Sequence, residues 1–202
     1  QLILHEVALA EGKDYFRLGE LSISPNGRLM AYSFDDNGSE RFLVKIRDLA
    51  TGALLDDEIP GTLSSLVWTS GNDAILYGVA NENWRTDNVR VHFLGQPTAN
   101  DSEIYKEPDI GFGVGIGKTA DDKWIVIATG DNETSEVRLL PADNPLAEQR
   151  MVSPRRKGRE YSVDAREGTL YIHTNDDHAN FRIATASIAQ PLIRPLYDTR
   201  SA

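Results

Sequence analysis

The sequence predicts an all-β protein folded as a β-propeller, with about four blades of four antiparallel strands each. Three observations predict this fold: a hairpin pattern that recurs along the chain, a recurrence period of about 45 residues, and a scarcity of helical periodicity. A β-sandwich also contains many short strands, but nothing in that fold imposes a repeat of this length.

Four segments share one layout: an apolar strand, a polar turn rich in Gly, Asp or Asn, and a second apolar strand. The turns begin near Ser24, Thr69, Thr119 and Ala165, so the spacings are 45, 50 and 46 residues. Two short strands joined by such a turn are typical of a β-hairpin. We therefore expect hairpins over residues 21–32, 66–77, 114–127 and 161–172.

A third strand of alternating character follows each hairpin, and a short outer strand completes each blade. The third strands are expected at residues 42–48, 89–93, 135–140 and 181–185, and the outer strands at 54–55, 103–105, 149–152 and 191–193. The blades then span roughly 21–62, 63–110, 111–158 and 159–202, after a lead-in of residues 1–20. Helix is expected only within 6–14 and 145–149.

The alternation also predicts which side chains pack one blade against the next. Leu66, Trp68 and Ile75 form one such set, and Trp124 and Val126 form another. The glycines of the third blade recur every second residue and should share one face of an inner strand, where backbones crowd around the axis: Gly111, Gly113, Gly115 and Gly117. A phosphate-binding loop would need a different glycine spacing and a following helix.

Composition excludes several classes of function. The net charge of −10 disfavours nucleic acid and anionic membranes as partners, although it would attract a cationic peptide or simply keep the domain soluble. The absence of cysteine excludes disulfides and thiol chemistry and suits the cytoplasm, where we expect the protein to act. No secretion signal and no apolar run of about 18 residues is present. The missing initiator Met indicates either a processed start or a cut chain, and we favour the latter.

The chain shows no catalytic constellation. The G-x-S-x-G elbow of α/β-hydrolases is absent. His92 alternates with apolar neighbours on a predicted strand, so we expect it to face solvent or a neighbouring blade. His178 could touch a metal together with Asp176 and Asp177, but such a loop is more often a solvated turn. We expect no catalytic residue, no metal and no cofactor in this chain.

One basic cluster is unusual in an acidic protein: Arg155, Arg156, Lys157 and Arg159, between the third and fourth blades. It is either a solvated loop or a docking patch for an acidic surface or another domain. Because four positive charges cannot be buried together without partners, we expect the patch to be exposed.

Several of these segments resemble the propeller of the oligopeptidase B group, within the prolyl oligopeptidase family of serine peptidases. The resemblance runs in order from about residue 3 to about residue 186, and its most specific stretch is residues 153–164. Further matching stretches are residues 10–16, 24–29, 67–68, 104–107 and 134–140.

The resemblance implies a seven-bladed propeller that covers an α/β-hydrolase domain with a Ser, Asp and His triad. It implies cleavage of short peptides after Arg or Lys, with the propeller limiting access. Residues 1–202 would then be a partial propeller without the catalytic domain, and the partners would be that missing domain and short basic peptides. By the same resemblance, Leu63 or Ser64 would face the active-site cavity.

Two alternatives remain open: a self-contained four-bladed propeller that binds proteins or peptides, and an enzyme with a site in the axial tunnel. The lack of clustered His residues counts against the enzyme. If four blades form an open arc, the flat apolar faces of its two terminal blades are uncovered. We then expect two chains to associate through those faces.

Overall fold

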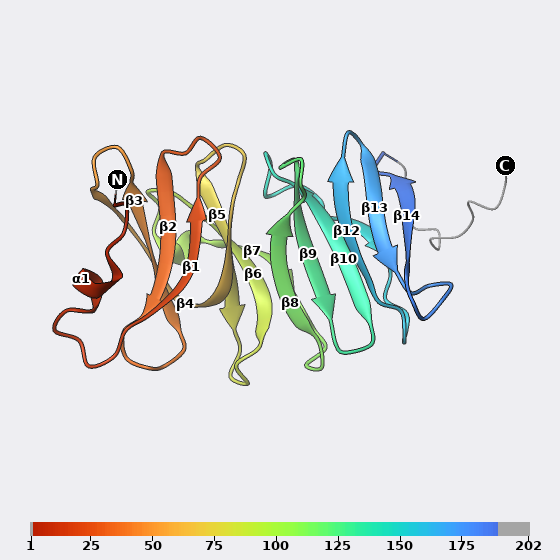
Figure 1. The fold of residues 1–202 in the computed structure, drawn as a ribbon, viewed down its shortest axis with the longest axis horizontal. Helices are drawn as coiled ribbons and strands as arrows, with labels where there is room; N and C mark the ends of the chain where they lie inside the picture. The colour runs from red at the N-terminus through yellow and green to blue at the C-terminus, as the bar shows by residue number, and fades with distance from the viewer. Residues whose placement is uncertain (1, 190–202) are drawn as a thin grey trace. The chain divides into compact units, whose positions relative to one another are not determined.

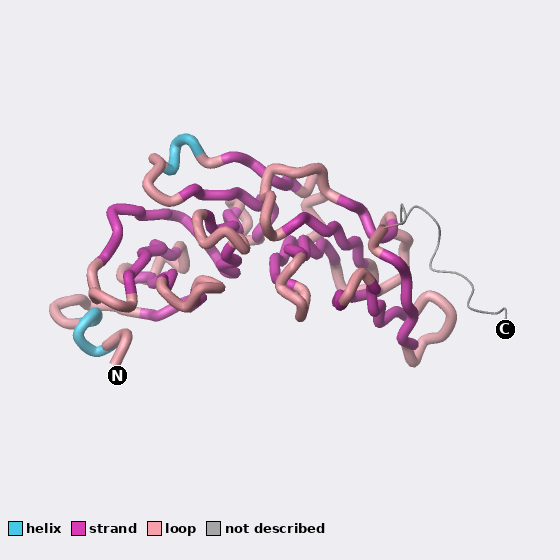
Figure 2. The backbone as a smooth tube through the Cα atoms, turned by 90° about the horizontal axis from the view of Figure 1, so that it is seen from above, coloured by secondary structure: helices cyan, strands magenta, loops and turns pink. Residues whose placement is uncertain are grey.

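The computed structural model describes residues 2–189 and is built almost entirely of antiparallel strands (Figure 1). Helix is limited in the described residues to one short α-helix, α1 (Glu6–Ala10), and one 3-10 turn at Thr98–Asn100 (Figure 2). The chain forms two compact units, Gln1–Pro108 and Asp109–Ala202. No helix in the described part of the chain is long and apolar enough to cross a membrane.

Unit 1 contains a seven-stranded sheet whose strands follow one another in chain order. Strand β4 is long because it pairs with β3 through its first half and with β5 through its second half. Gly61 and Ser65 adopt positive φ angles within β4, where the pairing changes from one neighbour to the other. The strands are β1 (Arg17–Ile23), β2 (Leu29–Asp35), β3 (Phe42–Asp48), β4 (Leu54–Trp68), β5 (Ala74–Ala80), β6 (Thr86–Phe93) and β7 (Ser102–Lys106).

The two halves of this sheet pack against each other through apolar side chains. The core contains the residues that alternation predicted, Leu66, Trp68 and Ile75, against Val44, Ile46 and Ile59. The Trp68 indole N–H also donates to the carbonyl of Ser22 on β1, at 3.1 Å. Burial of these side chains is the main favourable term that holds the two halves together.

The opposite face of β2 is covered, contrary to the expectation of an uncovered first blade. Met30, Tyr32 and Phe34 are buried there beneath apolar residues of the lead-in, namely Leu4, Leu9 and Phe16. Three large side chains on one sheet face would be costly to leave in water, and residues 2–16 remove them from it.

Unit 2 contains two sheets, one of four strands and one of three described strands. Val137, Leu139 and Val152 of the first sheet pack against Leu170 and Ile172 of the second, with Trp124 and Val126 at the border as predicted. The outer strand expected at 191–193 lies outside the described residues. The strands are β8 (Gly113–Lys118), β9 (Trp124–Gly130), β10 (Ser135–Pro141), β11 (Arg150–Ser153), β12 (Tyr161–Arg166), β13 (Thr169–Thr174) and β14 (Arg182–Ser187).

The structure confirms the predicted hairpins and third strands, with small differences at their ends. Strand β3 occupies the predicted residues 42–48, and the other third strands fall within β6, β10 and β14. Helix α1 is shorter than the predicted segment 6–14, and residues 145–149 form turns rather than helix. The short 3-10 turn at Thr98–Asn100 was not predicted.

The glycine stripe of β8 does not have the predicted environment. Gly111 precedes the strand, and an added Cβ at Gly113, Gly115 or Gly117 would meet no atom within 4 Å. No described residue therefore crowds the strand at these three positions. The sequence periodicity placed the three glycines on one face of β8, but the predicted close packing against that face is not observed.

Candidate functional site

The basic segment between β11 and β12 is fixed by backbone contacts to two neighbouring hairpins of unit 2. Ser135 N donates to the carbonyl of Arg159 at 2.9 Å, and Gly158 N donates to Thr134 Oγ1 at 3.3 Å. On its other side, Asn175 Nδ2 donates to the carbonyl of Gly158 at 3.2 Å. The segment therefore lies where the β9–β10 and β13–β14 hairpins turn.

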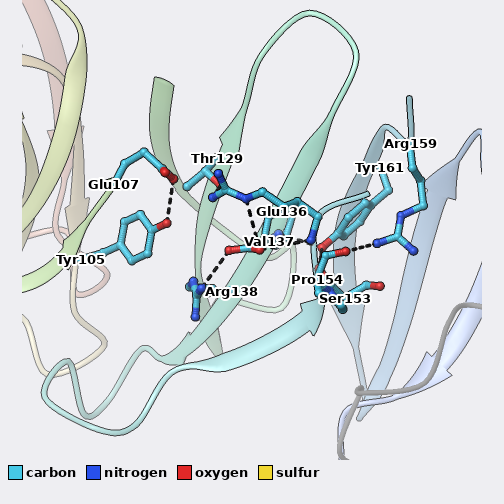
Figure 3. Close-up of polar contacts among 11 residues, drawn as sticks. Tyr105, Glu107, Thr129, Glu136, Val137, Arg138, Ser153, Pro154, Arg159 and Tyr161 are labelled. Carbon is cyan, nitrogen blue, oxygen red and sulfur yellow. Dashed lines mark hydrogen bonds and ion pairs between the residues drawn. The ribbon is translucent and has the colours of Figure 1, made fainter. Parts of the chain in front are cut away.

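Arg155 is half-buried and turned toward the strands. Its backbone N–H and its side-chain Nε lie 3.2 and 3.5 Å from Glu136 Oε2, and its guanidinium lies 4.2 Å from the ring centroid of Phe112. Arg138 donates to the other oxygen of the buried Glu136 at 2.8 Å (Figure 3). Two arginines thus compensate one buried carboxylate, which fixes the start of the basic segment.

The expectation that all four basic residues are exposed is wrong for Arg159. This side chain is only 4% exposed, donates to the carbonyl of Pro154 (Figure 3) and lies over the ring of Tyr161. Arg156 and Lys157 are exposed. The basic run therefore separates into two cations that are buried or half-buried and two that are exposed.

Tyr161 of β12 inserts its hydroxyl between β10 and β11, where the pairing of these strands is interrupted by a bulge. The hydroxyl accepts from Val137 N at 2.8 Å and donates to the carbonyl of Ser153 at 2.6 Å (Figure 3). Burial raises the pKa of Tyr161 to about 12, so the hydroxyl stays protonated and able to donate. The contact joins the two sheets of unit 2 directly beside the basic segment.

The two positions that the resemblance assigned to the cavity lie on β4. Leu63 is half-buried, and the side chain of Ser64 is outside the described part of the structure. Sequence reasoning missed two neighbouring residues at this end of unit 1. The Arg41 guanidinium lies 4.9 Å from the ring centroid of Trp84, which is a large exposed aromatic.

Of the two environments that the sequence left open for His92, solvent or a neighbouring blade, the structure shows the second, because His92 contacts Asp57 of the first predicted blade. It is fully buried, with Nε2 2.9 Å from Asp57 Oδ1 and Nδ1 2.8 Å from Asp101 Oδ1. Gly95 N donates to Asp57, and the Tyr77 hydroxyl donates to Asp101 at 2.7 Å. Burial, together with the bond to Asp101, raises the pKa of Tyr77. The cluster ties β4 to β5, β6 and the segment before β7.

Carboxylates of two acidic loops, one of which was weighed above as a metal site with His178, have partners within the chain. Asp176 forms an ion pair with Arg182 at 2.9 Å. Burial alone would raise the pKa of Asp35, but hydrogen bonds from backbone N–H groups, including those of Asn37 and Glu40, lower it. Within residues 2–189, no group of three or more His, Asp or Glu side chains could hold a metal ion.

The fold and these contacts define a β-propeller domain, in which successive small antiparallel sheets pack face to face. Residues 1–194 match the family model described as the prolyl oligopeptidase N-terminal β-propeller domain. The chain therefore belongs to the prolyl oligopeptidase family and corresponds to that domain.

Two curated relatives agree with this assignment. The chain is 36% identical over 188 residues to dipeptidyl aminopeptidase BI from Pseudoxanthomonas mexicana and 31% identical over 185 residues to Protease 2 from Moraxella lacunata. These alignments cover 92% and 91% of this chain but only 26% and 27% of the relatives. The chain thus spans about a quarter of their length.

Two solved structures have the same fold. Oligopeptidase B from Leishmania major superposes with a TM-score of 0.88 at 28% identity, and oligopeptidase B from Trypanosoma brucei with a TM-score of 0.86 at 31% identity. The superpositions cover 94% and 95% of this chain and 27% of each of the two structures. Both are larger peptidases, of which this chain resembles one part.

Proposed function

We propose that this domain restricts access to the active site of a serine oligopeptidase that cleaves short peptides after Arg or Lys. The observation that carries the proposal is the family match over residues 1–194. The basic specificity rests on the resemblance to oligopeptidase B, and the net charge of −10 supports it because an acidic surface attracts cationic peptides. The chemistry belongs to an α/β-hydrolase domain, since this chain has no G-x-S-x-G elbow.

In this proposal the chain contributes four blades with the boundaries 21–62, 63–110, 111–158 and 159–202, and the peptidase acts in the cytoplasm. The exposed Arg156 and Lys157 dock the hydrolase domain, while Arg155 and Arg159 hold the basic segment in place for this contact. Leu63 or Ser64 faces the cavity between the two domains.

The test compares the complete peptidase with the isolated chain. The complete peptidase should cleave a fluorogenic Arg-containing tripeptide, and cleave the same sequence much more slowly when it lies inside a long unstructured polypeptide. The isolated chain should show background hydrolysis only. The proposal is wrong if the isolated chain keeps an activity that survives repurification and is blocked by a serine-directed inhibitor, or if the long substrate is cleaved equally fast.

The isolated chain carries exposed apolar side chains on the last sheet that the structure describes. The outward face of the β12–β14 sheet carries Tyr171 and Ile183, which are 46% and 66% exposed, among polar neighbours. We propose that this face self-associates weakly. Sedimentation at several concentrations should show dimers that Ile183→Glu removes, and a strictly monomeric wild-type chain would contradict the proposal.

A further inference from the structure

One end of unit 1 carries Leu63 together with two loops, residues 36–41 and 81–85, to which the proposed function assigns no role. The strand register defines this end, because Thr62 of β4 pairs with Phe42 at the start of β3 and with Val79 near the end of β5. Residues 36–41 connect β2 to β3, and residues 81–85 connect β5 to β6. Since β4 lies between β3 and β5 in the sheet, these loops flank Leu63.

The loop between β5 and β6 displays Trp84 in an unusual conformation. The indole is 49% exposed, and the residue has a φ of 59°, a region that bulky side chains rarely adopt. Asn81 holds the loop: its Oδ1 accepts from Asn83 N and Arg85 N at 2.9 and 3.2 Å, and its carbonyl accepts from Trp84 N at 3.3 Å. Backbone strain at a residue that gains little burial points to a role outside folding.

Arg41 completes the arrangement from the neighbouring loop. Its guanidinium lies 4.9 Å from the Trp84 ring centroid and donates to the carbonyl of Asn81 at 3.4 Å. Among the described residues, no carboxylate lies within ion-pair distance of Arg41, in a chain with ten more acidic than basic residues. A guanidinium has five N–H donors, so Arg41 can still bind a carboxylate in the plane of the group.

We propose that Arg41 and Trp84 bind the carboxyl-terminal residue of a short peptide. The α-carboxylate pairs with the Arg41 guanidinium, and the apolar side chain of the same residue packs on the indole of Trp84. Both groups of the ligand branch from one Cα, which suits two protein groups only 4.9 Å apart. The inference rests on the proposed function, because it gives the peptide a docking point at the end that carries Leu63.

The surroundings favour a small ligand over a protein surface. The residues next to Arg41 and Trp84 are exposed and polar, namely Glu40, Glu82, Asn83 and Arg85. A stable protein interface buries about 800 Å² per partner around an apolar centre. One aromatic ring and one cation provide much less contact area than that, but they match the apolar side chain and the α-carboxylate of a single amino-acid residue.

Binding is tested on the chain itself, by titration with acetyl-Ala-Ala-Phe as the free acid and as its carboxyl-terminal amide. The indole N–H signal of Trp84 should shift with the acid, and the amide should bind about tenfold more weakly because the charge-assisted hydrogen bond is lost. Arg41→Gln should remove the difference between acid and amide. Arg28→Gln, which changes an exposed arginine of the same unit, should leave it intact.

Trp84→Asn separates binding from folding. Asn tolerates a positive φ, so the midpoint of thermal unfolding should stay the same or rise, while both peptides, followed by backbone amide shifts of residues 81–85, should bind more weakly. Tyr171→Ala, which removes an exposed aromatic from unit 2, serves as the control and should not change binding.

Equal affinity for acid and amide, absence of binding, or shifts that arise only on addition of a hydrolase domain would each overturn this inference. The proposed function fails by a different result, namely equal cleavage of short and long substrates by the complete peptidase. The two failures are therefore distinguishable.

Discussion

At the scale of single residues, buried polar groups hold the strands of each unit in register. His92 illustrates this, because both of its ring nitrogens meet carboxylate oxygens, which only accept hydrogen bonds. Asp57 and Asp101 reach it from β4 and from the segment before β7. All three groups are buried, and His92 links the two aspartates, which are also bonded by Gly95 N and by the Tyr77 hydroxyl.

Replacement of His92 by Leu should destabilise the chain strongly. Two buried aspartates would lose their shared hydrogen-bond partner, and leaving a buried polar group unpaired costs about 1–3 kcal/mol. Urea unfolding followed by tryptophan fluorescence measures the loss. His178→Asn, in an exposed loop, is the control and should change stability by less than about 0.5 kcal/mol. A similar small effect for both variants would show that the cluster does not stabilise unit 1.

Tyr161→Phe should destabilise the chain and reduce its sensitivity to high pH. The hydroxyl satisfies Val137 N and the Ser153 carbonyl, and leaving such groups unpaired costs about 1–3 kcal/mol. An unfolded tyrosine loses its proton near its ordinary pKa of 10.0, whereas burial raises the folded pKa to about 12. Between these values the native state binds more protons, so wild-type stability falls as pH rises from 10.0 toward 12.

Unfolding titrations of the wild type and Tyr161→Phe at several pH values between these limits check this prediction. The stability difference between them should shrink as the pH rises, because only the wild type has this proton to lose. A difference that stays constant with pH would contradict the assigned role of burial.

At the scale of the element, three of the four predicted hairpins close with the same side-chain contact. The hydroxyl oxygens of Ser24, Thr69 and Thr119 accept from the backbone N–H five residues later, at 2.9, 3.2 and 3.2 Å. The hairpin that begins at Ala165 has no hydroxyl there, and instead turns through Glu167 and Gly168, which both adopt positive φ. Two residues with positive φ are typical of a tight type I′ hairpin turn, which does not require the hydroxyl.

Thr119→Val should therefore lower the free energy of unfolding by about 1 kcal/mol. The substitution keeps the side-chain shape but removes the hydroxyl that accepts from Trp124 N and donates to Asp121. Ala165→Thr is the matched control and should give no gain, since its turn closes without a hydroxyl. Thermal and urea unfolding measure both changes. A stabilising Ala165→Thr would mean that the hydroxyl, rather than the turn type, limits the fourth hairpin.

At the scale of the whole molecule, the charged surface is where we propose that this domain contacts the rest of the peptidase. The chain carries a net charge of −10, yet Arg156 and Lys157 project from the basic segment, which is fixed by Arg155, Arg159 and Tyr161. Because the backbone of this segment is already fixed, little backbone conformational entropy is lost when a partner binds to its charges. Such a patch contributes more to orientation and association than to the stability of the propeller itself.

The double variant Arg156→Gln, Lys157→Gln should change the salt dependence of kcat/KM in the complete peptidase. Exposed ion pairs are worth about 0.2–1 kcal/mol each, so the loss of two pairs should change kcat/KM at low salt by roughly two- to thirtyfold, and the effect should vanish at high salt. Arg166→Gln, an exposed arginine on the last sheet, is the control. Identical kinetics of variant and wild type across ionic strength would show that Arg156 and Lys157 do not take part in docking.

Patterns along the chain predicted where the strands run, which side chains pack between sheets, and the family to which the chain belongs. Strand 42–48, the core residues Trp68 and Ile75, and the hairpin turns follow from alternation and turn chemistry, which depend on neighbours along the chain. One local signal was overlooked: Asp35 ends the second strand of the first hairpin, and Asn81, Asp131 and Asn175 directly follow the second strands of the other three.

The environment of His92, the burial of Arg159 and the pairing of Arg41 with Trp84 depend on how the chain folds in three dimensions. Asp57 lies 35 residues before His92, and Asn81 lies 40 residues after Arg41. The partners of the Arg159 side chain are near in sequence, but its carbonyl accepts from Ser135 N at the start of β10. Local patterns contain the preference of a residue for a strand or a turn. They do not show which remote segment contacts its side chain. That contact determines the burial, hydrogen bonding and charge compensation of the side chain.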